Sequence, residues 1–142
     1  MKFASLATAL LALVLPTLAQ TTVQSVSYDT TYDNPSTSLS TVACSNGVHG
    51  LETKGYTTFG SLHGFPYIGG AYTVTGWNSP ACGTCYSLTW RGTTIYVLAV
   101  DVGLDGFNIS EEAMNALTGG LAVELGRVNA NTTLVAASYC KL

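Results

Sequence analysis

The chemically most capable side chains of this 142-residue chain lie in one short segment that begins at Asp101. Hydrolysis by general acid–base catalysis often uses two carboxyl groups, one as the acid and the other as the base or nucleophile. Asp101 follows an apolar run and enters a glycine-rich stretch, a suitable position for one of them. Asn108 cannot serve as the other, because an amide does not exchange a proton as a carboxyl group does. Asp105, expected on a solvated turn, and Asp29, from a different loop, are weaker candidates, so the sequence favours ligand binding over hydrolysis.

Asp101 also has a purely structural interpretation, in which its carboxylate accepts backbone N–H bonds within its own loop. The same segment partly matches a calcium-loop template, at positions 1, 5, 6 and 12, through Asp101, Asp105, Gly106 and Glu112. Position 3 is Gly103, which has no side-chain ligand, and the preceding residues resemble a strand rather than a helix. His49 and His63 stand alone in glycine-rich loops without zinc-site spacing. We therefore expect neither a metal ion nor a cofactor.

Four cysteines form a second chemical group: Cys44, Cys82, Cys85 and Cys140. The Cys82-Gly83-Thr84-Cys85 spacing occurs in thiol redox motifs, but no thioredoxin-like βαβ pattern surrounds it here. An even cysteine count without such a pattern predicts two disulfides if the domain is secreted, and the sequence alone allows three pairings.

Amides and aromatic rings complete the candidates. Two glycosylation sequons begin at Asn108 and Asn131, and a glycan on Asn108 would block a binding site there, so we expect Asn108 to be unmodified.

Four aromatic residues lie near turns, where an exposed ring can stack on a sugar: Tyr28, Tyr56, Tyr72 and Trp77. For any one of them, core packing remains the simpler interpretation, and Trp90 is expected in the core.

The elements that must position these residues are mainly strands. Alternation over residues 24–31 predicts a half-buried strand, and Arg91-Gly92 predicts a hairpin between Cys85–Trp90 and residues 93–101. The run 95–100 is apolar without alternation, as in a strand buried on both faces. Residues 121–127 and 133–139 are predicted to form closing strands.

Helical structure is predicted to be short. Asn108 or Ser110 begins a helix that ends at Gly119-Gly120, with Met114 and Leu117 on its buried face. Single helical turns are expected around Leu51 and Phe59. Gly69-Gly70 and Asn78-Ser79-Pro80 are interpreted as breaks between elements. Many short strands with one helix indicate a small β-barrel.

The chain begins like a secreted protein. Lys2, an apolar run over residues 7–15 and small residues before Ala19 predict a signal peptide over 1–19, too short to span a bilayer. Residues 20–142 then form a single domain. Its four basic and eight acidic residues give a net charge of −4. Nucleic acid is excluded as a partner because no basic patch exists to neutralise phosphates.

The order of motifs closely resembles the cerato-platanins, small secreted fungal proteins. The matching segments, over about residues 25–140, are Val26-Ser27-Tyr28-Asp29, Ala43-Cys44-Ser45-Asn46-Gly47, His49-Gly50-Leu51, Gly64-Phe65-Pro66, Gly76-Trp77-Asn78-Ser79, Cys82-Gly83-Thr84-Cys85, Val100-Asp101 and Gly106-Phe107-Asn108-Ile109. Individually these motifs are weak, but in this order they are specific.

The resemblance implies a disulfide-stapled, six-stranded double-ψ β-barrel with short helices and pairs Cys44–Cys82 and Cys85–Cys140. It also implies an extracellular or wall-associated protein that binds chitin or other wall polysaccharide oligomers, loosens polysaccharide without cleaving it, and acts as an elicitor in plants. The family's groove maps onto Asp101 and Asn108, and we add the neighbouring Gly106, Phe107, Tyr28 and Asp29. A surface-active or receptor-recognised signalling protein is the first alternative, and a weak glycoside hydrolase is the second. We expect a monomer or weak self-association.

Overall fold

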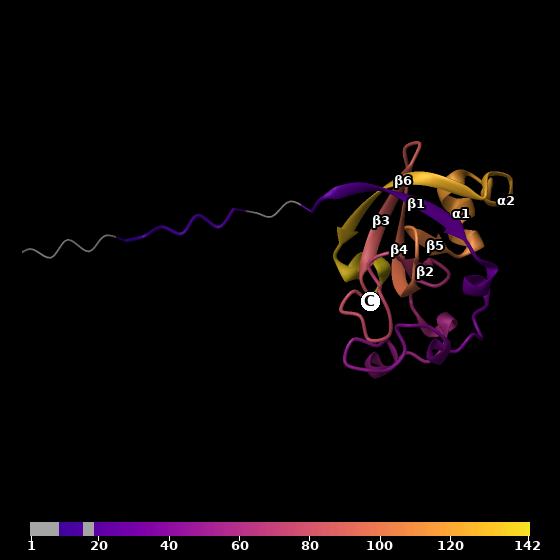
Figure 1. The fold of residues 1–142 in the computed structure, drawn as a ribbon, viewed down its shortest axis with the longest axis horizontal. Helices are drawn as coiled ribbons and strands as arrows, with labels where there is room; N and C mark the ends of the chain where they lie inside the picture. Colours follow the sequence, from indigo (N-terminus) through magenta and orange to yellow (C-terminus); the bar gives the residue numbers. More distant parts are fainter. Residues whose placement is uncertain (1–8, 16–18) are drawn as a thin grey trace, which may run out of the picture.

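The computed structural model describes residues 9–15 and 19–142, and its main feature is a closed barrel of six strands (Figure 1). The strands are β1 Thr21–Tyr28, β2 Ile68–Ala71, β3 Cys85–Trp90, β4 Thr93–Val102, β5 Phe107–Ile109 and β6 Arg127–Val135. They are ordered β1, β5, β2, β4, β3, β6 around the barrel. Two pairs, β1 with β5 and β2 with β4, are parallel, so they join segments far apart in sequence. The predicted fold class, mainly β with short helices, is confirmed.

The helices within the described residues are short, as predicted. Two are α-helices, α1 Glu111–Thr118 and α2 Ala122–Leu125. Five are 3₁₀ turns, η1 Thr30–Asp33, η2 Leu39–Thr41, η3 Glu52–Lys54, η4 Phe59–Ser61 and η5 Ala137–Cys140. The turns η3 and η4 confirm the helical turns expected around Leu51 and Phe59, both of which are fully buried.

The β3–β4 hairpin forms where its turn residues predict it. Arg91 and Gly92 both have positive φ, 46° and 80°, as a two-residue hairpin turn of matching twist requires. Strand β4 is buried at Ile95 and over residues 97–100, whereas Thr93, Thr94 and Tyr96 are exposed and its last two residues are half-buried. Helix α1 also starts and ends at predicted residues, because the Ser110 hydroxyl accepts a hydrogen bond from the Ala113 amide and Gly119 ends the helix in a left-handed conformation.

The prediction for Gly69-Gly70 was wrong, because both glycines lie inside strand β2. A Cβ atom on Gly69 would collide with the Asn108 carbonyl of β5, and one on Gly70 with the Val102 carbonyl of β4. Glycine here allows three strands to approach closely rather than ending an element. A β-bulge between the two residues shifts the register of β2 against β4.

The two closing strands were also placed incorrectly. The segment predicted over 121–127 is largely helix α2, whose Ala122 amide is held by the Asn115 side chain of α1 at 3.0 Å. A single strand, β6, spans Arg127–Val135, with Val128, Ala130 and Thr132 buried on its inner face. The rest of the segment predicted over 133–139 enters η5, where Cys140 is bonded to β3.

Both implied disulfides are present, Cys44–Cys82 and Cys85–Cys140. They close loops of 38 and 55 residues in sequence separation, for which the chain-entropy model gives about 4 kcal/mol each. Two such bonds fit an extracellular protein, since they persist in oxidising compartments.

The N-terminal segment lies outside the barrel. Residues 9–15 are exposed and contain neither helix nor strand. The predicted signal peptide also includes residues 1–8 and 16–18, which lie outside the described residues, so its cleavage stays a prediction. In the described part of the chain, no helix has the length and apolar character needed to cross a membrane.

Candidate functional site

A shallow groove of about 350 Å³ lies at the loop that joins β4 to β5. Its lining comes from this loop, from β5, and from the ends of β1 and β6: Ser27, Val102, Gly103, Leu104, Asp105, Gly106, Phe107, Asn108 and Arg127. Strand register explains why these distant residues meet. Ser27 is paired with Asn108 on one side and with Arg127 on the other.

Gly106 sets the position of the groove. Its φ of +113° is rarely adopted by other residues, and a Cβ atom there would collide with the Ser25 carbonyl of β1. The loop can therefore lie directly against β1, which allows Phe107–Ile109 to pair with it in parallel.

Asn108 lies half-buried at the centre of this arrangement. Its carbonyl oxygen Oδ1 accepts a hydrogen bond from the Ser27 hydroxyl at 2.9 Å. Its amide nitrogen Nδ2 has no acceptor among the described residues, so two N–H donors remain for a ligand. A side chain that is oriented at one atom and unpaired at the other suits the recognition of hydroxyl or carbonyl oxygens.

The groove also contains charge. The Arg127 guanidinium donates a hydrogen bond to the Ser25 hydroxyl. Within the described residues, Arg127 and Asp105 do not form a salt bridge, although both line the groove. Asp105 is exposed and is the single carboxylate among the described residues that line the groove. A carboxyl pair with the spacing of a glycosidase is therefore lacking in the groove as described.

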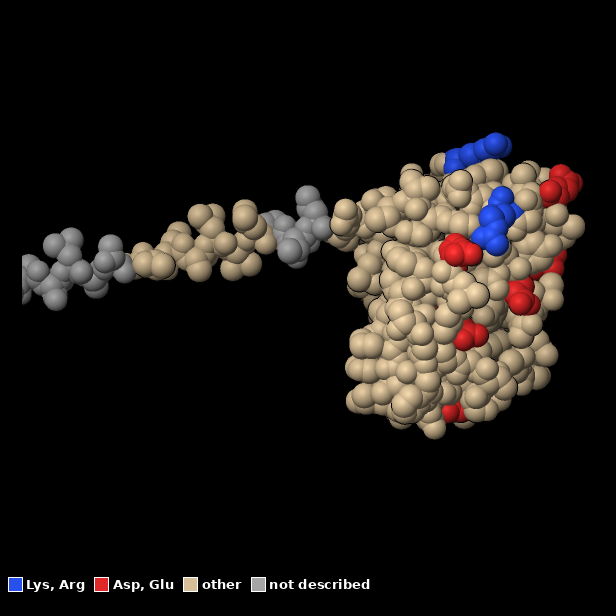
Figure 2. Space-filling model, viewed as in Figure 1, with Lys and Arg blue, Asp and Glu red and all other residues tan. Residues whose placement is uncertain are grey.

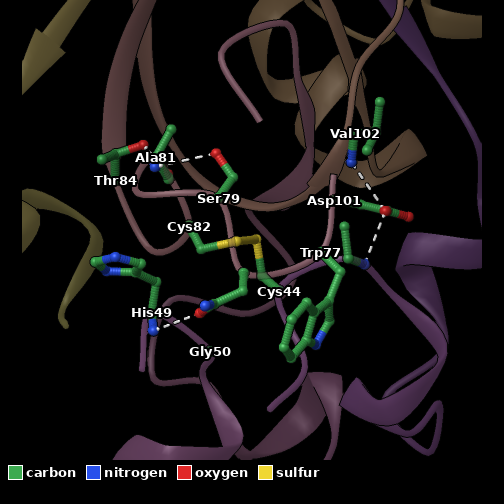
Figure 3. Close-up of a disulfide and its surroundings, with 12 residues drawn as sticks. Cys44, His49, Gly50, Trp77, Ser79, Ala81, Cys82, Thr84, Asp101 and Val102 are labelled. Carbon is green, nitrogen blue, oxygen red and sulfur yellow. Dashed lines mark hydrogen bonds between the residues drawn. A yellow bond between two sulfur atoms is a disulfide. The ribbon is translucent and has the colours of Figure 1, made fainter. Parts of the chain in front are cut away.

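Asp101 lies beside this groove rather than in its lining. Its Oδ1 accepts a hydrogen bond from the backbone amide of Val102 at 2.8 Å (Figure 3) and another from the Ala43 amide at 3.1 Å. Its Oδ2 accepts one from the Tyr32 hydroxyl at 3.1 Å. Gly70 pairs with Asp101 on one side and Asn108 on the other, so their backbones lie about 10 Å apart.

The two backbone contacts agree with the structural interpretation of Asp101, in which its carboxylate accepts backbone N–H bonds. The third contact is with Tyr32, which the sequence did not indicate as a partner. Burial of Tyr32, together with the negative charge of Asp101, raises the pKa of the Tyr32 hydroxyl well above its ordinary value. Tyr32 therefore remains a hydrogen-bond donor over the whole physiological range. A contact between Asp101 and a sugar stays a prediction.

The remaining predicted residues have separate positions. Phe107 is 2% exposed, and its ring packs edge-on against Tyr72 and Tyr86. Phe107 therefore lines the groove mainly with its backbone. Asp29 caps η1 by accepting a hydrogen bond from the Thr31 amide at 2.8 Å. Tyr28 is half-buried against the core. Neither Tyr28 nor Asp29 lines the groove.

Sequence reasoning missed Ser27 and Arg127 as site residues, although Ser27 lies within a quoted motif. Only the register of β1 against β5 and β6 brings them to Asn108. Figure 2 shows that most of the visible surface is uncharged and that the charged side chains lie mostly in the upper right part of the barrel. No cluster of three or more potential metal ligands occurs within residues 9–15 and 19–142.

The fold and the groove define a small disulfide-bonded barrel protein with an open, polar groove. The chain belongs to the cerato-platanin family, whose model matches residues 24–142. It is similar to "Allergen Asp f 15" of Aspergillus fumigatus, with 57% identity over 116 residues that cover 82% of this chain and 76% of that protein. Cerato-platanin of Ceratocystis fimbriata f. sp. platani is 43% identical, over 89% of this chain and 93% of that one.

Solved structures of cerato-platanins have the same fold as this chain. Cerato-platanin 3 from M. perniciosa superposes with a TM-score of 0.82 at 50% identity, over 85% of this chain and all of that one. The solution structure of "the fungal elicitor Cerato-Platanin" gives a TM-score of 0.74 at 44% identity, covering 82% of this chain and 95% of that one.

Proposed function

We propose that this protein is secreted and binds chains of wall polysaccharide, of the chitin type, in the groove at Asn108 without cleaving them. The observation that carries the proposal is the Asn108 side chain, held by Ser27 at one atom and left with two free N–H donors at the other. Hydroxyl and acetamido oxygens of a neutral sugar are suitable acceptors for these donors.

Three features support binding without hydrolysis. Asp105 is the single carboxylate among the described lining residues, and it is exposed. Asn108 cannot act as an acid or base. The oxygens of Asp101 already accept three hydrogen bonds from the protein, which suits a positioning carboxylate better than a proton-transfer group.

The groove is shallow and open, so binding is expected to be weak, with a Kd between about 10 μM and 1 mM. Wall loosening would follow if the protein separates neighbouring polysaccharide chains by competing for their hydroxyl groups. The relative described as a fungal elicitor supports a second role in plant defence, in which a plant receptor recognises the protein.

The test is an NMR titration of the 20–142 protein with chitin oligomers, in which amide and sugar signals are followed together. Asn108→Ala removes the free donors and is expected to weaken binding about tenfold. Asn131→Ala, an exposed asparagine on β6 outside the groove, is the matched control and should bind like the wild type. Equal affinities for wild type and Asn108→Ala would refute the groove assignment, and shortening of the sugar would refute binding without hydrolysis.

A further inference from the structure

We propose that a second groove, built around Tyr96 and Tyr139, binds the flat face of a sugar unit in a neutral polysaccharide. The groove encloses about 310 Å³ and lies where the start of β4, the loop before β2 and the turn η5 meet. Its lining is Gly64, Tyr67, Thr94, Ile95, Tyr96, Tyr139, Cys140 and Lys141. None of these residues lines the groove at Asn108.

The aromatic rings carry the argument. Tyr96 and Tyr139 stack with centroids 4.9 Å apart and an angle of 24° between their planes. The pair is not in the core, because Tyr96 is 37% exposed and Tyr139 is 58% exposed. Stacking covers one face of each ring and leaves apolar surface in the groove, where the C–H groups of a sugar face would be buried.

The hydroxyl groups of the tyrosines supply the polar half of the recognition. Tyr67, Tyr96 and Tyr139 all line the groove, and their phenol oxygens have no hydrogen-bond partner among the described residues. Each can donate and accept, so three adjustable polar groups and the stacked rings line the same groove. A pyranose unit, with apolar faces and a rim of hydroxyl groups, matches this combination.

The groove is rigid, which lowers the entropic cost of binding. The Cys85–Cys140 disulfide ties η5 to β3, immediately beside Tyr139. Gly64 packs so closely on η5 that a Cβ atom would lie 2.7 Å from the Cys140 carbonyl oxygen. The Tyr67 carbonyl accepts a hydrogen bond from the Leu98 amide at 3.0 Å, which fixes the other wall.

Charge and the adjoining sheet favour a neutral polysaccharide over a cationic peptide. Lys141 is the single charged side chain among the described lining residues, so a cationic ligand is disfavoured. Beyond Tyr96, a row of uncharged side chains continues across the sheet in strand register, through Ser87, Thr133 and Thr21. These hydroxyl groups extend the surface along which a sugar chain can lie.

The two grooves lie on different parts of the barrel. The Asn108 groove uses β1, β5, the start of β6 and Val102 at the end of β4, whereas the tyrosine groove uses residues 94–96 near the start of β4. One molecule can therefore contact two polysaccharide chains, and two weak sites together raise the avidity for a wall. The inference shares its ligand class with the proposed function but none of its residues.

The experiment is an NMR titration with chitohexaose and cellohexaose that follows the tyrosine ring signals. Tyr139→Ala is expected to weaken binding at this groove about three- to tenfold, and Tyr139→Phe to weaken it less because the ring remains. Trp77→Ala is the matched control, since Trp77 is 63% exposed and lines neither groove. An amide spectrum as dispersed as that of the wild type shows that each variant has folded.

The outcomes separate the two proposals. Shifts of the Tyr96 and Tyr139 rings that persist in Asn108→Ala, together with a smaller Tyr96 shift in Tyr139→Ala, support the second groove. Ring signals that do not respond, with shifts at Asn108 retained, overturn the inference and leave the proposed function intact. Ring shifts without any response at Asn108 support the inference and refute the first site. The inference is also overturned if Trp77→Ala weakens sugar binding as much as Tyr139→Ala does. It is overturned as well if the ring signals do not respond to sugar and Tyr139→Ala instead abolishes a monomer–dimer equilibrium.

Discussion

At the scale of single residues, the Asp101 carboxylate has two kinds of hydrogen-bond donor, backbone amides and a buried phenol. Substitution of Asp101 by alanine would leave the Ala43 and Val102 amides and the Tyr32 hydroxyl without their acceptor. Such a variant loses stability whether or not Asp101 contacts sugar. Loss of activity on that substitution therefore does not identify a ligand-binding residue, and Tyr32 offers a cleaner test.

Tyr32→Phe removes one donor to Asp101 and is expected to cost about 2 kcal/mol of unfolding free energy. Because the pKa of Tyr32 is raised in the folded state, the unfolded state loses this proton first as the pH rises above 10.0. The wild-type protein should therefore lose stability above this pH, and Tyr32→Phe should lose less. Urea unfolding at pH 8 and pH 11 measures both, and parallel pH dependences would contradict the assignment.

At the scale of elements, Ser110 joins helix α1 to the barrel. Its hydroxyl accepts a hydrogen bond from the Ala113 amide and donates one to the Pro66 carbonyl just before β2. Ser110→Ala should lower the free energy of unfolding by about 2 kcal/mol, because a fully buried cap loses both bonds. Ser36→Ala, in an exposed turn, is the control and should change it by less than about 0.5 kcal/mol. Thermal denaturation compares the two, and similar midpoints would show that Ser110 does not anchor the helix.

At the scale of the whole molecule, the disulfides hold the loops onto the barrel. Replacing Cys85 and Cys140 together by alanine should lower the free energy of unfolding by about 4 kcal/mol and Tm by about 15 °C. It should also release η5 and so weaken sugar binding at the tyrosine groove, while binding at Asn108 persists. Replacing Cys44 and Cys82 together is the control, with a similar loss of stability and an intact tyrosine groove. Calorimetry and the NMR titration measure these effects, and equal losses at both grooves in both variants would contradict them.

Local signals in the sequence determined a substantial part of this structure. The hairpin at Arg91-Gly92, the start of α1 at Ser110 and its end at Gly119 follow from backbone conformations and caps that involve only neighbouring residues. The family resemblance implied the disulfide pairing and a site around Asn108. The pairing is present, and the site remains a proposal.

Only the tertiary structure decided how distant strands are paired. Gly69-Gly70 has the composition of a break, yet it forms a central strand because β4 and β5 leave no room for a Cβ atom. Ser27 and Arg127 lie beside Asn108 because of strand register. Tyr139 lies against Tyr96 because the Cys85–Cys140 disulfide holds η5 on the barrel. Turns and caps depend on a few consecutive residues, so the sequence alone determines them. Register and close approach depend on packing across the whole barrel, so they, and both grooves, emerge only when it closes.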